Sequence, residues 1–162
     1  MRIVLSLIAA ALLAGCATSS NWSHPLRGDY PTLTPQDAGS GAYTGTRVRW
    51  GGRVVRVEAR NDTTCFEIAG TQLSEAGRPL WAPQVPWGRF IACRRGSYDP
   101  AQFTTERDVT FVGPIDGIEE RRVNGAIYRF PRVAADIVYL WPQAEVRPTR
   151  AAPWPWWGYW GF

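Results

Sequence analysis

Residues 47–60 read RVRWGGRVVRVEAR, and this stretch decides the fold class. Val48 and Trp50 alternate with arginines, and after Gly51-Gly52 hydrophobic side chains again fall at every second position. A period of two with β-branched residues predicts a β-strand, and the paired glycines predict a bulge or sharp bend within it. The stretch therefore indicates one long, bent strand.

The sequence that follows continues the strand pattern. Asn124-Gly125 is a strong hairpin signal because both positions tolerate a positive φ, and residues 101–106 are expected to form one helical turn. Further strands are expected at residues 64–69, 88–94, 109–113, 115–123, 126–130 and 133–141. Without a long amphipathic helix, the pattern predicts an all-β fold: a small antiparallel β-barrel, OB-like, of about five to seven strands. An open sandwich is the alternative.

Composition sets limits on function. The 162 residues are 45% hydrophobic and 20% charged, which is typical of one globular domain. All 18 basic residues are arginine, against 14 acidic residues, and a net charge of +4 does not indicate a nucleic-acid-binding protein. One His and three Cys are too few for an ordinary Cys/His zinc site. We expect no metal, no cofactor and no nucleic-acid partner.

The N-terminus has the features of an export signal. Arg2 precedes an apolar run over residues 3–13, which is shorter than the roughly 20 residues that span a membrane. Leu13-Ala14-Gly15-Cys16 then resembles the bacterial lipobox, which predicts that Cys16 is the lipidated first residue of the mature chain, with palmitate among its acyl chains. The alternative is an ordinary signal peptide with a buried Cys16. Ala17, rather than Asp, resembles the pattern that sorts lipoproteins to the outer membrane.

Four segments are therefore expected. Residues 1–15 are the signal peptide, 16–42 a lipidated Cys and flexible tether, 43–142 the β module, and 143–162 a Pro/Trp-rich tail. His24 lies in the tether, where we expect a solvated side chain.

The tail is the most unusual segment because it is rich in aromatic side chains. Trp and Tyr favour both membrane interfaces and protein interfaces, so the tail is a candidate for membrane, partner or glycan contact; packing back onto the module is the alternative. The candidate residues are Trp154, Trp156, Trp157, Tyr159, Trp160 and Phe162.

An ordered set of short motifs resembles the Slp family of outer-membrane lipoproteins. The motifs are Val48-Arg49-Trp50-Gly51-Gly52, Thr64-Cys65-Phe66-Glu67-Ile68, Gly77-Arg78-Pro79, Gly88-Arg89-Phe90-Ile91-Ala92, Val109-Thr110-Phe111-Val112-Gly113, Tyr128-Arg129-Phe130-Pro131 and Leu140-Trp141-Pro142. The resemblance implies a lipoprotein of the cell envelope and supplies no established catalytic activity to carry over. Cys65 and Cys93 depart from the family pattern.

Lipidation of Cys16 leaves Cys65 and Cys93 as an even pair in an oxidising compartment. We expect a disulfide between neighbouring strands; two buried thiols are the alternative. Arg47, Arg49, Arg53 and Arg56 are candidates for contact with lipid or lipopolysaccharide phosphates, or else form a solvated strand face.

Catalytic candidates are few. The lone His24 lies outside the module, and no G-x-S-x-G motif is present. Asp116, Glu119 and Glu120 are the remaining acid cluster for a hydrolase. They precede Arg121-Arg122 in the expected hairpin, and cross-strand ion pairs on a solvated face are the alternative.

The sequence thus predicts a non-enzymatic, lipid-anchored β module of the outer membrane, anchored in lipid through Cys16. Its expected role is structural or an interaction with an envelope protein or lipopolysaccharide. A periplasmic ligand- or glycan-binding module is the second interpretation, and a hydrolase is the third.

Overall fold

Six strands and one short helix make up the part of the chain that the computed structural model describes, residues 25–81 and 87–143. The elements in chain order are α2 (Pro35–Ala38), β1 (Arg47–Arg60), β2 (Thr63–Thr71), β3 (Arg89–Arg95), β4 (Asp108–Val123), β5 (Ala126–Ala134) and β6 (Ile137–Leu140). The prediction of a mostly β chain with five to seven strands is confirmed. No helix in these two ranges is long and apolar enough to cross a membrane.

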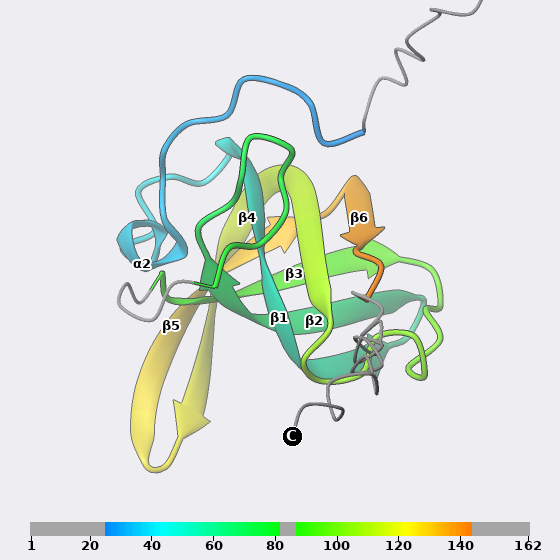
Figure 1. Ribbon diagram of the computed structural model, residues 1–162. Coiled ribbons are helices and arrows are strands. Elements are labelled where there is room, and N and C mark those ends of the chain that lie inside the picture. Colours follow the sequence, from blue (N-terminus) through cyan, green and yellow to red (C-terminus); the bar gives the residue numbers. More distant parts are fainter. Residues whose placement is uncertain (1–24, 82–86, 144–162) are drawn as a thin grey trace, which may run out of the picture.

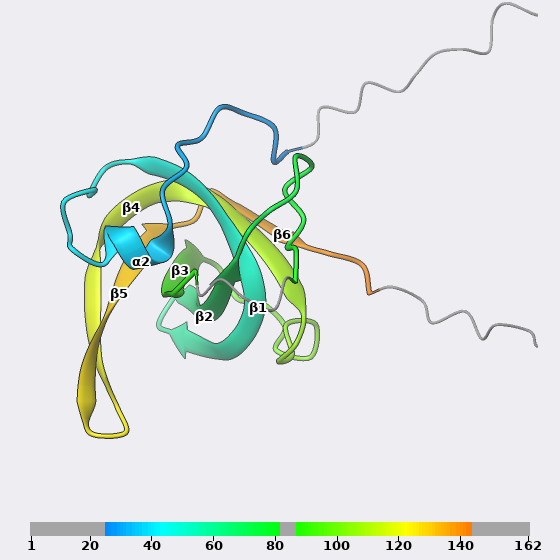
Figure 2. The ribbon, with the colours of Figure 1, turned by 60° about the vertical axis from the view of Figure 1, so that its left-hand side comes forward.

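The strands form one sheet in the order β1-β2-β3-β5-β4-β6, with an additional pairing of β1 to β4. Five strands therefore make a near-ring, and β6 pairs with β4 outside it (Figures 1 and 2). The sheet is mixed rather than wholly antiparallel as expected, because β3 and β5 run parallel from Ile91↔Arg132 to Cys93↔Ala134. The cause is topological: β4 reverses the chain direction between β3 and β5, so the two strands point the same way.

Gly51 and Gly52 lie where β1 is paired on both sides, with Thr71 and Gly70 of β2 and with the start of β4. A Cβ on Gly52 would lie 1.9 Å from the carbonyl oxygen of Ala69, and one on Gly51 would lie 2.7 Å from that of Val109. No side chain fits at either position. The irregularity in register comes slightly later than the glycines, between Val54 and Arg56.

Strand β4 joins two segments that were expected to be separate. It runs without a break through Pro114, with a register shift between Ile115 and Gly117 where it leaves β1 and pairs with β5. The expected strand 133–141 is instead divided: Ala135 donates its N–H to Cys93 O, and Asp136 donates its N–H to Val112 O, both at 2.8 Å. Strands β5 and β6 therefore pair with successive stretches of β4, residues 115–123 and 109–112 respectively.

The expected helical turn at 101–106 is wrong. Asp99 accepts the N–H of Ala101 through its side chain at 2.9 Å, which closes a turn. Glu106 has φ of 73°, which is incompatible with a right-handed helix. The segment instead carries Phe103 into the core, where it is 7% exposed.

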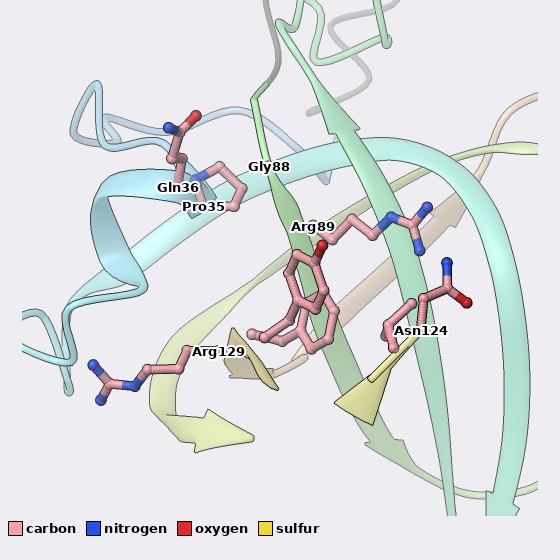
Figure 3. Close-up of a pocket in the computed structure, with 9 residues that line it drawn as sticks. Pro35, Gln36, Gly88, Arg89, Asn124 and Arg129 are labelled. Atoms are coloured by element: carbon pink, nitrogen blue, oxygen red, sulfur yellow. The ribbon is translucent and has the colours of Figure 1, made fainter. Parts of the chain in front are cut away.

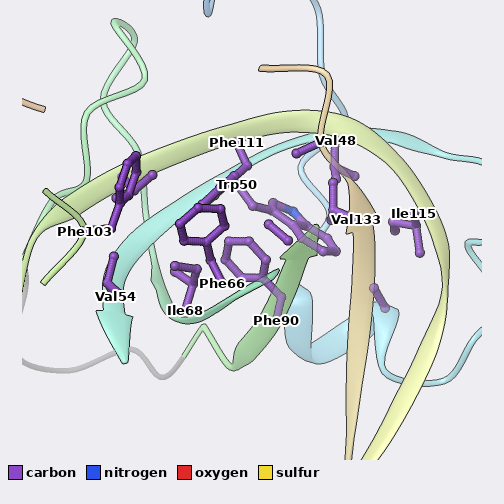
Figure 4. Packing of buried hydrophobic residues seen from close by; sticks show 14 residues of the cluster. Val48, Trp50, Val54, Phe66, Ile68, Phe90, Phe103, Phe111, Ile115 and Val133 are labelled. Atoms are coloured by element: carbon purple, nitrogen blue, oxygen red, sulfur yellow. The ribbon is translucent and has the colours of Figure 1, made fainter. Parts of the chain in front are cut away.

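The core fills the near-ring with aromatic and branched side chains (Figure 4). Phe66 is its centre, with ring centroids 5.0 Å from Phe103 and 5.4 Å from both Tyr98 and Phe111. Tilted and edge-on contacts of this kind add to the free energy gained from burial. Trp50 packs edge-on to Phe90 and donates its Nε1–H to Leu33 O at 2.7 Å.

That last contact corrects the expected tether, because the described part of it, residues 25–42, packs against the module. Leu26 and Ala38 are fully buried. The short helix begins at Pro35, and the Thr34 hydroxyl accepts the N–H of Asp37 at 3.1 Å, which is ordinary N-capping. Residues 16–24, including Cys16 and His24, lie outside the described residues, as does the tail from residue 144.

We predict that Gly52→Ala lowers the free energy of unfolding by about 3 kcal/mol or more, because the new methyl group meets backbone rather than a movable side chain. Gly45→Ala is the control: Gly45 has a positive φ of 88°, unlike Gly52, and a Cβ there meets nothing within 4 Å. Its expected cost is about 1–2 kcal/mol. Urea unfolding of both variants measures the difference, and equal losses would contradict the role of the close approach.

Candidate functional site

The β4–β5 hairpin projects from the body of the molecule (Figure 1). Asn124 and Gly125 form its turn with φ of 51° and 85°, so the predicted hairpin is confirmed. Near the tip, Ile127 is 62% exposed and Tyr128 is 51% exposed. Exposed apolar side chains on a projecting hairpin are typical of a contact surface rather than of a core element.

Beside the hairpin lies a hollow of about 560 Å³, here called the hairpin groove. It is bounded by α2, the start of β3 and the hairpin (Figure 3). The lining residues are Pro35, Gln36, Gly88, Arg89, Val123, Asn124, Tyr128, Arg129 and Phe130. Its volume falls in the range of pockets that bind small molecules or short peptide segments.

The groove exists because β3 and β5 stay paired over only three residue pairs. Toward Arg89 on β3 and Phe130 on β5 the two strands diverge, which leaves the near-ring open between them. Helix α2 covers part of this opening, where Gln36 donates its N–H to Trp87 O at 3.2 Å. Sequence reasoning missed Pro35 and Gln36 as site residues because they fall in the expected tether, although Thr34-Pro35 is a recognisable helix start.

The groove combines aromatic and polar side chains. Tyr128 stacks on Phe130 with ring centroids 6.3 Å apart and an angle of 22° between the planes. Arg89 and Arg129 point to opposite sides of the groove, and the Asn124 amide lies on the same side as Arg89 (Figure 3). A surface of this kind binds by stacking and hydrogen bonding, and it presents no arrangement of nucleophile and base.

A network of ion pairs fixes the hairpin to the sheet. Arg121 of β4 is 15% exposed and contacts three carboxylates: Glu58 at 3.0 Å, Glu67 at 3.0 Å and Glu119 at 2.8 Å. Arg60 of β1 binds Glu119 with both Nη atoms, at 3.0 and 2.8 Å. Because the network joins strands β1, β2 and β4, it restrains the hairpin relative to the ring.

The same network shifts the ionisation of its members. The Arg60 hydrogen bonds, aided by Arg121, lower the pKa of Glu119 to about 2 against the opposing effect of burial. Hydrogen bonding from Arg60 likewise lowers the pKa of Glu58. The pKa of Arg60 is raised, with Glu119 as the largest cause. These groups are fully ionised near neutral pH, so none is tuned for proton transfer there.

The expected acid cluster does not come together. Glu119 belongs to the network, whereas Glu120 faces Arg129 at 3.6 Å and Asp116 contacts Arg132 at 2.9 Å. Asp116 lines a separate, shallow hollow that also holds Asp136, which is itself paired with Arg47. The ion-pair interpretation of these carboxylates therefore describes the structure.

The arginine stripe on β1 is mostly neutralised. Arg47 pairs with Asp136, Arg53 with Glu106 at 2.9 Å, and Arg56 with Glu58 at 3.5 Å. Arg49 donates to Leu26 O at 2.9 Å and lies over the Tyr30 ring. The four residues do not form a common phosphate site.

Cys65 and Cys93 are directly opposite each other on β2 and β3 and form a disulfide. The bond lies in a small apolar cluster with Ile91 and Phe130. With a sequence separation of 28, the chain-entropy model gives a contribution of about 3–4 kcal/mol. Because Phe130 of β5 packs in the same cluster, the disulfide supports the base of the hairpin.

Several expected site residues fall outside the described ranges: Cys16 and the aromatic tail residues Trp154, Trp156, Trp157, Tyr159, Trp160 and Phe162. Within residues 25–81 and 87–143, no group of three His, Cys, Asp or Glu side chains is placed to hold a metal ion.

Comparison with known proteins places these features in a family. The model of the outer membrane lipoprotein Slp family matches residues 13–162, which include the predicted lipobox and the tail. The uncharacterized lipoprotein YeaY of Escherichia coli K12 is 30% identical over 152 residues, covering 90% of this chain and 76% of that protein. Outer membrane protein Slp of the same strain is 30% identical over 122 residues, covering 75% of this chain and 63% of its own length. An uncharacterized Haemophilus influenzae protein is 27% identical over 133 residues, covering 82% and 70%.

We predict that Glu119→Gln lowers the free energy of unfolding at pH 7 by about 2 kcal/mol, because charge-assisted hydrogen bonds from Arg60 and Arg121 are lost. Since the folded-state pKa of Glu119 lies below its unfolded value, its contribution is complete above about pH 4.5 and disappears as the pH falls toward 2. The variant should therefore show a flatter decline of stability over that window in urea unfolding.

Glu120→Gln is the matched control, because its pair with Arg129 is longer and half-exposed. Its expected loss is at most about 1 kcal/mol. A Glu119→Gln variant as stable and as pH-dependent as the wild type would contradict the role of the network.

Proposed function

Because the chain belongs to the outer membrane lipoprotein Slp family, we propose that it is a lipid-anchored, non-catalytic β module that binds an envelope protein through the hairpin groove. Its anchor is the acylated Cys16. The observation that carries the proposal is the hairpin groove itself: a stacked aromatic pair flanked by Arg89 and Arg129, on a rigidly supported projection.

The near-ring supports a finer description as an OB-like barrel. The order β1-β2-β3-β5-β4, closed by the β1–β4 pairing, gives five strands around one core. OB-folds are partly open five-stranded barrels that bind ligands across a face and its loops. On this description the β4–β5 hairpin is a binding loop of the barrel.

A binding role is favoured over hydrolysis by the state of the carboxylates. Asp116, Glu119 and Glu120 face Arg132, Arg60 and Arg129 respectively. General acid catalysis by a carboxyl needs a raised pKa, whereas that of Glu119 is lowered to about 2.

An extended segment of an envelope protein fits the groove best. The opening between β3 and β5 is elongated by strand divergence, and Arg129 is half-exposed with a single distant carboxylate partner. Arg89 is paired with Glu67 at 3.0 Å, so an acidic segment carrying an apolar side chain would meet chiefly the Arg129 guanidinium and the Tyr128 ring. A glycan is the second candidate, because the exposed Tyr128 ring and the amides of Gln36 and Asn124 line the same hollow.

We predict that Cys16→Ser releases the chain from the outer-membrane fraction. Serine has no thiol for diacylglyceryl transfer, and acyl chains contribute about 0.8 kcal/mol per buried methylene. Fractionation of cells followed by immunoblotting measures the distribution. Retention of the variant wholly in the outer membrane would show that acylation of Cys16 is not what holds the chain there.

We predict that a photo-crosslinking residue at position 128 captures an envelope protein in intact cells, because Tyr128 is exposed in the groove. The same residue at position 43 is the control, since Tyr43 is 41% exposed but does not line the groove. Mass spectrometry identifies the adduct. The adduct should disappear when Arg129→Glu reverses the charge beside it; capture that is equal at both positions, or insensitive to Arg129→Glu, would contradict the proposal.

A further inference from the structure

Near residue 25, where the described chain begins, the chain packs against Trp141, close to residue 143, where it ends. Leu26 is fully buried with Val112 and Trp141 in one apolar cluster. Its carbonyl accepts a hydrogen bond from Arg49 at 2.9 Å. In both overall views this start of the described chain and the hairpin tip lie on opposite sides of the molecule (Figures 1 and 2).

This inference rests on the proposed function, in which Cys16 is acylated. Only a short segment separates Cys16 from this side of the molecule. Cys16 precedes Pro25 by nine residues, which reach at most about 30 Å when fully extended. As a flexible chain they would span about 16 Å on average. The surface around Leu26 therefore stays within reach of the bilayer that holds the acyl chains.

A hollow of about 440 Å³ lies on this side of the molecule. Its lining residues are Arg53, Arg78, Glu106, Arg107, Asp108, Trp141, Pro142 and Gln143. The hollow lies near the start of the described chain. Gly77, which precedes the lining residue Arg78, is close enough to Leu26 that a Cβ on it would lie 3.1 Å from the Leu26 side chain. Three guanidinium groups and two carboxylates leave a net positive charge in the hollow.

The positive charge belongs to two particular arginines. Arg53 is paired with Glu106 at 2.9 Å and lies 3.7 Å from Asp108. In the part of the chain that the structure describes, Arg78 and Arg107 have no carboxylate partner; they donate to the carbonyl oxygens of Pro142, at 3.4 Å, and Trp141, at 3.1 Å. The Nε atom of Arg107 is shielded from solvent and has no hydrogen-bond partner among the described residues.

Trp81 lies beside the same hollow, because it contacts two of the residues that line it, and Leu80 precedes it in the chain. Leu80 and Trp81 are each 43% exposed. The Trp81 ring lies 4.0 Å from the Arg53 guanidinium carbon, and its Nε1–H donates to Asp108 at 3.0 Å. An indole that is held by its N–H while its ring faces solvent is suited to the headgroup region of a membrane.

We propose that this surface, the anchor-side face formed by Arg53, Arg78, Leu80, Trp81 and Arg107, docks on anionic phospholipid headgroups of the leaflet that carries the acyl chains. Arg78 and Arg107 contact lipid phosphate, for which the planar guanidinium is well shaped. Leu80 and Trp81 enter the interface beside them. Docking by this face turns the hairpin groove away from the bilayer, toward the partner.

The test is co-sedimentation of the unlipidated mature chain, Cys16→Ser, with vesicles of phosphatidylcholine containing phosphatidylglycerol. An arginine near an anionic surface contributes about 1 kcal/mol, so Arg78→Gln with Arg107→Gln should weaken binding by roughly 10- to 30-fold. Wild-type binding should also fall steeply with salt and be weak on pure phosphatidylcholine.

Arg95→Gln with Arg122→Gln is the matched control, because both residues are exposed, neither lines the hollow, and the change in net charge is the same. It should change binding by less than about 3-fold if the attraction is local rather than general. Equal losses in the two double variants, or no loss in Arg78→Gln with Arg107→Gln, would overturn the proposal.

Two further variants separate docking from misfolding and from the proposed function. Arg78→Lys with Arg107→Lys keeps both positive charges, so it should restore most of the vesicle binding. Arg78→Gln alone leaves the Arg107 hydrogen bond to Trp141 in place, so it tests the charge of Arg78 without removing that contact. If the lysine variant is folded but remains as weak as the glutamine variant, charge at these positions is not responsible. Absence of crosslinking from position 128 in a chain with all its arginines intact would indicate failure of the proposed function, whatever the vesicle binding shows.

Discussion

The close approach of backbones at two glycines is the constraint on which the near-ring depends. Gly52 faces the carbonyl of Ala69, and Gly113 faces that of Ala134, where a Cβ would lie 2.1 Å from the oxygen. At the first position β1 is paired with β2 and β4 at once; at the second, β4 lies against the end of β5 and the start of its connection to β6. Glycine permits both contacts, since any other side chain would separate strands whose pairing closes the ring.

Arginine chemistry then decides how the hairpin is held. A long two-stranded ribbon is marginally stable in isolation. Here Phe130 packs in one apolar cluster with the disulfide, and Arg121 joins the hairpin to Glu58 of β1. One guanidinium can serve three carboxylates because its donors form a planar fork; an ammonium group lacks this geometry. The network therefore holds the β4–β5 hairpin, whose residues line the hairpin groove, in a fixed position relative to the sheet.

The sequence was informative wherever local chemistry decides the structure. The alternation around Trp50 and the Asn124-Gly125 turn predicted real elements, and the cysteine count pointed to the pair that the structure joins. It was misleading where tertiary contacts decide. Leu26 and Leu33 stand in a Pro- and Ser-rich stretch with no periodicity, yet they pack on the module and accept hydrogen bonds from Arg49 and Trp50. The hairpin groove could not be predicted, because it results from the divergence of two strands that are distant in sequence.

Net charge proves to be a poor guide to the function of this chain, and the pairing of individual arginines a better one. Eight arginines of the described ranges are committed to carboxylates, among them three of the four in the conspicuous stripe on β1. Electrostatic attraction to a surface depends on charge that is left over after such pairing. Arg78, which the sequence showed only as part of the Gly77-Arg78-Pro79 motif, and Arg107 retain theirs. In the proposed arrangement this local excess of positive charge faces lipid, while the hairpin groove lies on the opposite side of the molecule.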